Sequence, residues 1–178
     1  MLSETNIRKA AYDDVEDVQQ VYAKSWAEAY TGVIEEEALR QATSEPAQFY
    51  PEKKIRAQLE NEDSLYLVAE TSNGIIGMSY FAWGEKRTHP FVDSGSAQLR
   101  AIYVDPAHWG EGAGRALLEA GLDRLPATPD EVVIECITGN ERARAFYESQ
   151  GFEQYGDRSI ECFDGEEHRT TLYRRPLR

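Results

Sequence analysis

Hydrophobic positions in the first third of the chain recur at the spacing of amphipathic helices. A helix is expected over residues 13–29, behind an acidic pair, with an apolar stripe formed by Val15, Val18, Val21, Tyr22, Trp26 and Ala29. A weaker helix is expected near 35–42. Pro51 suits the first turn of a third helix that reaches about residue 61.

The pattern changes to strands beyond residue 64. Apolar or alternating segments predict strands over 65–69, 75–83, 97–104 and 131–137, a strand from residue 152, and a last strand around 170–173. The 131–137 segment is almost continuously apolar, as in a central strand. Helices are expected around 116–122 and over 140–150. This order predicts the α/β class with a mixed sheet.

Length and composition favour one folded domain over residues 1–178. The chain is 41% hydrophobic, which argues against a disordered chain. It has no run of 18 apolar residues and no signal-peptide pattern near Met1, so we expect a cytoplasmic protein without a membrane partner. Cys136 and Cys162 are then expected to be unpaired thiols, with Cys136 in the core.

The net charge is −13, from 32 acidic and 19 basic residues. Such a surface repels phosphate backbones, which disfavours nucleic acid and anionic membranes as partners. Two interpretations of the acidity stay open. It attracts a cationic substrate such as an amine, or it adapts the protein to a high-salt, halophilic cytoplasm.

Three alternating glycines, Gly110, Gly112 and Gly114, follow the 97–104 strand and precede a helix. Free N–H groups at such a helix start bind anions. A P-loop is excluded because Arg115 follows the last glycine where Lys is required, and a dinucleotide fingerprint is excluded because no third glycine has the right spacing. A plain tight turn and capture of the diphosphate of an acyl-CoA remain.

Two segments resemble the GCN5-related N-acetyltransferase (GNAT) family. Residues 109–114 (WGEGAG) are similar to its Q/R-x-x-G-x-G/A loop, except that Trp109 replaces Gln or Arg. Residues 140–152 (NERARAFYESQGF) are similar to its N-x-x-A-x-x-F-Y-x-x-x-G-F segment. The resemblance covers about 97–155. It implies a GNAT fold, in which a central, mostly antiparallel mixed sheet with two splayed parallel strands is flanked by helices.

The resemblance also implies acetyl-CoA as cosubstrate. Backbone amides of the glycine turn would hold the diphosphate, a strand would pair with the pantetheine arm, and Asn140 would cap its helix or contact that arm. The cofactor-binding residues so implied are Ile102, Tyr103, Val104, Trp109, Gly110, Glu111, Gly112, Ala113, Gly114, Arg115, Asn140 and Tyr147.

Tyr147 and Glu135 are the expected catalytic residues. Tyr147 matches the family's usual acid, and a protonated phenol can donate to the departing thiolate. Its alternative role is a half-buried aromatic. Glu135 lies in an apolar strand that would raise a carboxyl pKa, which suits a base. It precedes Tyr147 by twelve residues, the offset between base and acid in the family's protein N-terminal acetyltransferases. Its alternative role is a solvent-facing strand residue.

The resemblance places the acceptor beside Trp26, Tyr30, Trp83 and the 84–96 loop, where aromatic rings could contact a cation. Packing in the core is the alternative for each. The three histidines share no ligand spacing, so no metal site is expected.

The function expected is acetyl transfer by direct attack in a ternary complex. The acceptor is a primary amine, either a small amine or polyamine or a protein N-terminus. Residues 159–167 are faintly similar to polyamine-acetylating members of the family, which favours a small amine. Homodimers are common in the family. The alternative is a non-catalytic acyl-CoA sensor or partner-binding module.

Overall fold

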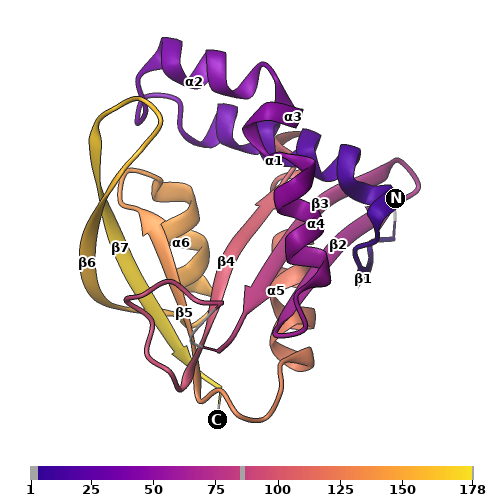
Figure 1. The fold of residues 1–178 in the computed structure, drawn as a ribbon, viewed down its shortest axis with the longest axis vertical. Helices are drawn as coiled ribbons and strands as arrows, with labels where there is room; N and C mark the ends of the chain where they lie inside the picture. The colour runs from indigo at the N-terminus through magenta and orange to yellow at the C-terminus, as the bar shows by residue number, and fades with distance from the viewer. Residues whose placement is uncertain (1–3, 85–86, 178) are drawn as a thin grey trace.

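The computed structural model describes residues 4–84 and 87–177, which fold into a sheet with helices on both faces (Figure 1). Seven strands have the order β1-β2-β3-β4-β5-β7-β6. Their bounds are β1 Asn6–Lys9, β2 Ser64–Thr71, β3 Gly74–Ala82, β4 Ser96–Val104, β5 Glu131–Ile137, β6 Glu153–Glu161 and β7 Glu167–Pro176. Neighbours are antiparallel except β4 and β5, which are parallel. The expected mixed, mostly antiparallel sheet is confirmed.

The helices form a layer on each side of this sheet. The α-helices are α1 Val15–Ala29, α2 Glu36–Thr43, α3 Pro46–Phe49, α4 Glu52–Glu60, α5 Ala113–Arg124 and α6 Glu141–Ser149, with short 3-10 turns at Tyr12–Asp14 and Pro106–His108. Helix α1 and helix α4 pack on one face, where Val18 and Ile55 join Tyr66 and Met78. Helices α5 and α6 cover the other face (Figure 1).

Most of the expected elements are confirmed, and the differences have local causes. The four-residue helix α3 and strand β1 were not expected, because each is too short to show a period. The acidic pair does not cap α1 through a side chain. Instead the buried Asp14 carboxylate accepts two hydrogen bonds from Arg8, at 2.8 and 2.9 Å, and so ties β1 to the helix.

A β-bulge in strand β4 shifts the alternation of its side chains between the two faces of the sheet. Tyr80 of β3 pairs with Ala101 and Phe81 pairs with Leu99, so Arg100 is the extra residue. Before the bulge, Leu99 packs on the α5 face. Beyond it, Ile102 packs on that face and Tyr103 packs on the α1 face. A single inserted residue therefore sets which β4 side chains reach each side of the sheet.

Strands β4 and β5 splay apart beyond their first residues. They pair only from Ser96↔Glu131 to Gln98↔Val133. Strand β5 then follows β7 as far as Ile137, while β4 follows β3 as far as Val104. The edge of β4 that faces β5 thus carries main-chain donors and acceptors that the sheet does not use.

Among the described residues, every helix is either too short or too polar to cross a bilayer.

Candidate active site

The glycine turn before α5 depends on left-handed backbone conformations. Gly110 has φ 80° and Gly112 has φ 92°, values that side chains with a Cβ rarely adopt. Gly112 is the N-cap of α5, and the first backbone bond of the helix runs from Ala116 N–H to Gly112 C=O at 3.0 Å. The N–H groups of residues 113–115 therefore precede that bond and are free to bind an anion.

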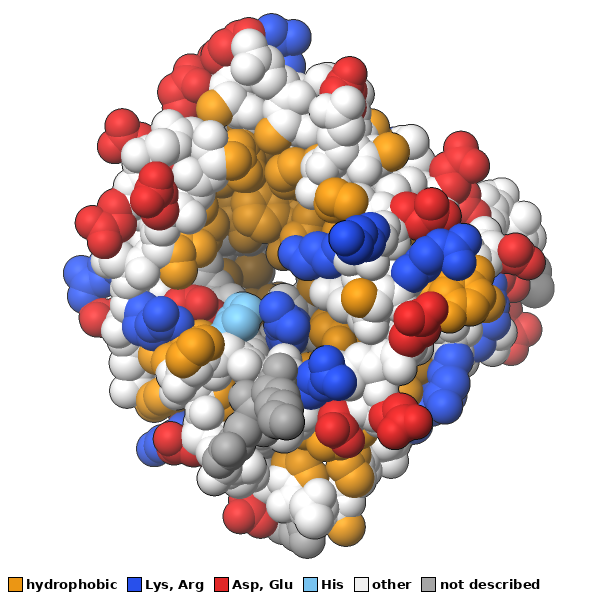
Figure 2. Space-filling view, viewed as in Figure 1, with side chains coloured by type: hydrophobic (Ala, Val, Ile, Leu, Met, Phe, Trp, Pro, Cys, Tyr) orange, Lys and Arg blue, Asp and Glu red, His pale blue; other side chains and the backbone are white. Residues whose placement is uncertain are grey.

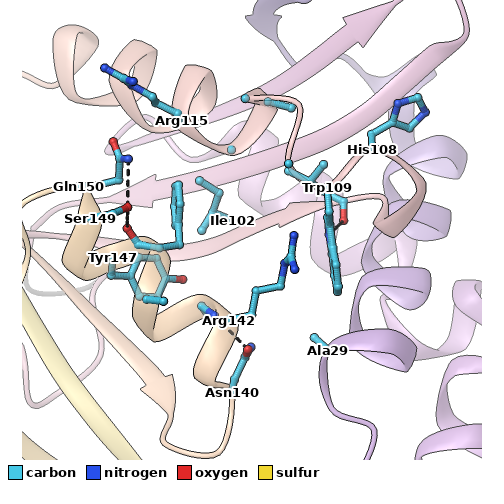
Figure 3. A pocket seen from close by; sticks show the side chains of 18 residues that line it. Ala29, Ile102, His108, Trp109, Arg115, Asn140, Arg142, Tyr147, Ser149 and Gln150 are labelled. Atoms are coloured by element: carbon cyan, nitrogen blue, oxygen red, sulfur yellow. Dashed lines mark hydrogen bonds between the residues drawn. The ribbon is translucent and has the colours of Figure 1, made fainter.

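A cavity of about 520 Å³ lies between this turn, β4 and α6 (Figure 3). Ten of the twelve expected cofactor residues line it, namely Ile102, Val104, Trp109, Gly110, Gly112, Ala113, Gly114, Arg115, Asn140 and Tyr147. The other two do not. Tyr103 lies on the opposite side of β4, and the Glu111 carboxylate contacts Nδ1 of His108 at 3.0 Å. Arg115 lines the cavity with its Nε bonded to Glu119 at 2.9 Å.

Trp109 replaces the polar residue of the family signature and has a structural contact of its own. Its indole N–H donates to the carbonyl of Val104 at 2.8 Å, which fixes the turn to the end of β4. The guanidinium of Arg142, from the first turn of α6, lies 4.3 Å from the centre of the Trp109 ring. Figure 3 shows Arg142 pointing into the cavity toward Trp109. Helix α6 thus provides a cation beside the glycine turn, in addition to Arg115 of α5.

Tyr147 reaches the same cavity from α6. Its side chain is buried, at 8% exposure, and it packs beside Phe146, Phe152 and Tyr173. Burial raises the pKa of Tyr147 well above its ordinary value, and the neighbouring Cys136 and Tyr30 raise it further. The phenol is therefore protonated at neutral pH and able to donate a proton. The same burial raises the pKa of the Cys136 thiol to about 12, which keeps this cysteine unreactive.

Asn140 connects the cavity to the start of α6. Its side-chain oxygen accepts from the backbone N–H of Ala143 at 3.1 Å, which is a helix N-cap. Its amide also lies within hydrogen-bonding reach of the Tyr30 hydroxyl, whose pKa is raised overall by burial. Asn140, which lines the first cavity, therefore also approaches Tyr30, which lines the second.

A second cavity, of about 240 Å³, opens on the other side of β4. Figure 2 shows it as a hollow with hydrophobic walls and with histidine and basic side chains at its edge. Its residues are Tyr22, Trp26, Tyr30, Tyr50, Lys54, Gln58, His89, Gln98, Leu99, Arg100, Ala101, Tyr103, Glu135, Ile137, Ile160 and Thr170. Two expected acceptor residues, Trp26 and Tyr30, are among them. Trp83 is not, because it packs with the core on the α5 face.

Glu135 lies in this second cavity, on the side of β5 away from α6. Its Oε2 accepts a hydrogen bond from the Thr170 hydroxyl at 2.7 Å and lies 3.5 Å from Nη1 of Arg158. Its side chain is 12% exposed. Glu135 and Tyr147 therefore lie on opposite faces of the sheet, each lining one of the two cavities.

Sequence reasoning missed Arg142, Lys54 and Arg100, and it included His89 only as part of the 84–96 loop. Arg142 stands at a position where the family segment accepts any residue, directly before the matched Ala143. Its nearness to the motif is the only signal that could have pointed to it. The others come from α4, a loop and the β4 bulge. No local pattern joins them, since tertiary folding brings them together.

Comparison with known proteins identifies the family. The model of the acetyltransferase (GNAT) family matches residues 23–152. A "Probable N-acetyltransferase" of Mycobacterium tuberculosis is 27% identical over 150 residues, 84% of this chain and 80% of that protein. An N-alpha-acetyltransferase of the same organism is 32% identical over 107 residues, 60% of this chain and 63% of that one. The chain covers only 28% of a Mycobacterium leprae protein described as uncharacterized, at 35% identity.

Solved structures share the fold. An N-acetyltransferase from Staphylococcus aureus superimposes with a TM-score of 0.74 at 20% identity, covering 99% of this chain and all of that one. The PaiA N-acetyltransferase of Thermoplasma acidophilum, in complex with coenzyme A, gives 0.72 at 21% identity over 94% of this chain and 98% of that one. The matched family model, the glycine turn and the splayed strands agree, and the chain belongs to the GNAT acetyltransferase family.

Proposed function

We propose that this chain is an N-acetyltransferase that transfers the acetyl group of acetyl-CoA to a primary amine, with residues 1–178 forming one catalytic domain. The observation that carries the proposal is the pair of cavities on opposite sides of β4, where it separates from β5. One has the backbone cradle for a diphosphate. The other holds a carboxylate and leads to the same gap. Two substrates in one complex need such an arrangement.

The residues of the first cavity fit coenzyme A. Amides at the start of α5 would bind the diphosphate oxygens, with Arg142 as a nearby cation. The unused edge of β4 beyond Ala101 would pair with the amides of the pantetheine arm. Acetyl-CoA supplies the acetyl group as a thioester. A β4 main-chain N–H facing the gap is suited to stabilise negative charge on the thioester oxygen.

The protons are assigned to the two expected catalytic residues. An alkyl ammonium, with a pKa near ~10.4, must lose a proton before it attacks. Glu135 would take that proton, directly or through water. The amine nitrogen then bonds to the acetyl carbon, the carbon–sulfur bond breaks, and Tyr147 would donate its proton to the departing sulfur, whose thiol pKa is about 8.5. The raised pKa of Tyr147 means that the phenol still holds its proton at neutral pH, so a proton is present at the site.

The acceptor class follows less directly. The candidates are a small amine or polyamine and the N-terminus of a protein. The aromatic walls, with Trp26 and Tyr30 centroids 4.2 Å apart, suit an aliphatic amine. Association as a homodimer belongs to the same proposal.

The test combines binding and turnover. Calorimetric titration with CoA and acetyl-CoA should show binding, and acetyl-CoA with a panel of amines, amino acids, polyamines and peptides should release free thiol. Tyr147→Phe should lower kcat while leaving acetyl-CoA affinity nearly unchanged, since it removes one hydroxyl from a packed ring. Tight binding without turnover on any acceptor would instead indicate a sensor, and unchanged kcat in Tyr147→Phe would refute the acid role.

A further inference from the structure

The second cavity has a basic wall, in contrast to the acidic chain around it. Lys54 of α4 and Arg100 of the β4 bulge both line it. Among the described residues neither forms an ion pair within 4.0 Å, although acidic residues outnumber basic ones by 32 to 19 in the sequence. Two cations on one cavity wall repel each other, and a bound anion between them would relieve that repulsion.

Arg100 is held in place with donors to spare. One terminal nitrogen donates to the carbonyl of Arg87 at 3.3 Å, and the other lies 3.1 Å from Nε2 of His89. Its Nε is buried and has no hydrogen-bond partner among the described residues. A guanidinium that is half-buried and incompletely bonded is costly unless a ligand completes its bonds.

His89 makes the excess of donors clearer. Because Arg100 can only donate, Nε2 of His89 must accept, and the proton then lies on Nδ1. Nδ1 is 2.9 Å from the Gln98 amide nitrogen, which also only donates, while the Gln98 oxygen already accepts from the His89 backbone N–H. Rotating the amide by 180° only moves the conflict to that backbone N–H. This wall therefore offers more donors than the chain has acceptors for.

Burial and the charge of Arg100 lower the pKa of both Lys54 and His89. The charge of Glu135 raises the pKa of His89, and the charge of Arg158 lowers it. His89 is therefore neutral near pH 7, and the positive charge of the wall comes from Arg100 and Lys54. Opposite them on β5, Glu135 is the carboxylate that lines the cavity.

We propose that the acceptor is a small primary amine that also carries an anionic group, a carboxylate as in a free amino acid, with the anion bound by Arg100 and Lys54 and the amine directed to Glu135. This rests on the proposed function and narrows its acceptor class. The transfer is unchanged: nitrogen bonds to the acetyl carbon, carbon separates from sulfur, and one proton leaves nitrogen while one reaches sulfur. The cavity volume of about 240 Å³ lies below the usual range for drug-sized ligands, which favours a small acceptor.

The same geometry disfavours the other acceptor classes. A polyamine would bring a second cation against Arg100 and Lys54. A peptide N-terminus has its first carboxylate replaced by a neutral amide, which leaves the basic wall without a partner. The acidic surface favours amines in general, but Arg100 and Lys54 favour those amines that also carry a carboxylate.

The experiment compares matched acceptors with saturating acetyl-CoA, using thiol release to obtain kcat/KM. Each set contains an amino acid, its amide and the corresponding amine without the carboxylate, with spermidine and a tripeptide beside them. The variants are Arg100→Gln and Lys54→Gln. Lys53→Gln is the matched control, because Lys53 and Lys54 are both exposed residues of α4 and Lys53 does not line the cavity.

The parent should prefer the acid over its amide by about tenfold or more, the effect of a charge-assisted hydrogen bond. The ratio should fall toward one in both variants and stay unchanged in Lys53→Gln. A merely structural role of Arg100 would lower all rates together and leave the ratio intact. If Arg100→Gln does not fold, Lys54→Gln alone carries the test.

Equal or better use of the amide, spermidine or the tripeptide by the parent would overturn the proposal and leave the acetyltransferase function standing. If no amine is acetylated, the proposed function fails. Whether Arg100 and Lys54 bind an anion is then tested separately, by measuring thermal unfolding with the amino acid or its amide present. Stabilisation by the amino acid but not by its amide, lost in Arg100→Gln, would support the subsite. Equal stabilisation by both, or by neither, would overturn it.

Discussion

Two glycines of the same turn should respond oppositely to substitution by alanine. Gly112 has φ 92°, and a Cβ placed on it would meet no atom within 4 Å. The cost of Gly112→Ala is therefore backbone strain alone, about 1–2 kcal/mol for a left-handed residue. Gly114 has an ordinary helical backbone, and its Cβ would lie 3.5 Å from Cζ of Phe146, a normal contact. Gly114→Ala should gain up to about 1 kcal/mol in helix propensity.

The two variants should thus differ by about 1–3 kcal/mol in the free energy of unfolding. In a chain of this size 1 kcal/mol shifts Tm by about 2–4 °C, so the difference is measurable by thermal unfolding of matched samples. Gly112→Ala should also bind CoA more weakly than Gly114→Ala. If the turn relaxes to relieve the strain in Gly112→Ala, it loses the arrangement of amides, and 1.4 kcal/mol corresponds to about a tenfold weaker Kd.

Gly114→Ala serves as the matched control for binding. Its methyl group would lie beside Phe146, and the family signature accepts Gly or Ala at this position, so CoA affinity should stay close to that of the parent. Equal Tm values for the two variants would refute the strain argument. A Gly112→Ala variant that binds CoA within twofold of the parent would refute the dependence of the anion cradle on the left-handed residue.

Four further predictions follow from local contacts and charge. Gly121→Ala should destabilise the protein by about 3 kcal/mol in urea unfolding, because its Cβ would lie 2.1 Å from Cε2 of the buried Phe81; an unchanged midpoint would contradict this. Hydrogen bonds from Arg8 lower the pKa of Asp14, so the stability from this pair is present above the ordinary carboxyl pKa and is lost as pH falls through the lowered one. Asp14→Asn should therefore lower the free energy of unfolding by about 2 kcal/mol at pH 7. The difference in this free energy between parent and variant should narrow between pH 5 and pH 2, and a constant difference would exclude the linkage. Arg142→Gln should weaken CoA binding about tenfold at low salt and less at high salt, by calorimetry, whereas an affinity independent of the variant would remove Arg142 from the diphosphate site. If the charge of −13 is an adaptation to salt, Tm should rise from low salt to molar KCl, and a Tm that does not rise counts against it.

Most residues expected to bind the coenzyme line one cavity, because the signals that marked them are local. Glycines at alternate positions, followed at once by a helix, require a turn with exposed amides, and the 140–152 segment carries its own helix start and end. Asn140 does cap α6, and Gly151 ends it with φ 85°. Ten of the twelve expected cofactor residues line the first cavity for this reason.

Side-chain direction along β4 could not be predicted in the same way. Ile102, Tyr103 and Val104 were grouped because they are consecutive, but neighbours on a strand point to opposite faces. Tyr103 therefore lines the second cavity. The bulge at Arg100 also interrupts the alternation from Leu99 onward, and nothing in the local composition marks it.

The lining of the second cavity was predicted only in part because it is assembled from distant segments. Trp26 and Tyr30 were found from their place at the end of the first helix. Trp83 was expected from its place before a loop, but it extends β3 on the same side as Phe81 and so packs under α5. Lys54 and Arg100 are separated by 46 positions in the sequence and meet only after α4 packs over the sheet.

The charge of the whole chain and the charge of the second cavity have opposite consequences for an acceptor. A net charge of −13 draws in cations from a distance, but salt screens this attraction beyond a Debye length of about 8 Å. Contacts with Arg100 and Lys54 act at hydrogen-bond range, where screening is weak. A molecule with only positive charge gains from the first effect and loses from the second. If the second cavity is the acceptor site, as we propose, a molecule with an ammonium and a carboxylate loses part of the long-range attraction but meets an opposite charge at both ends of the cavity. Selection would then be made by contact and not by steering.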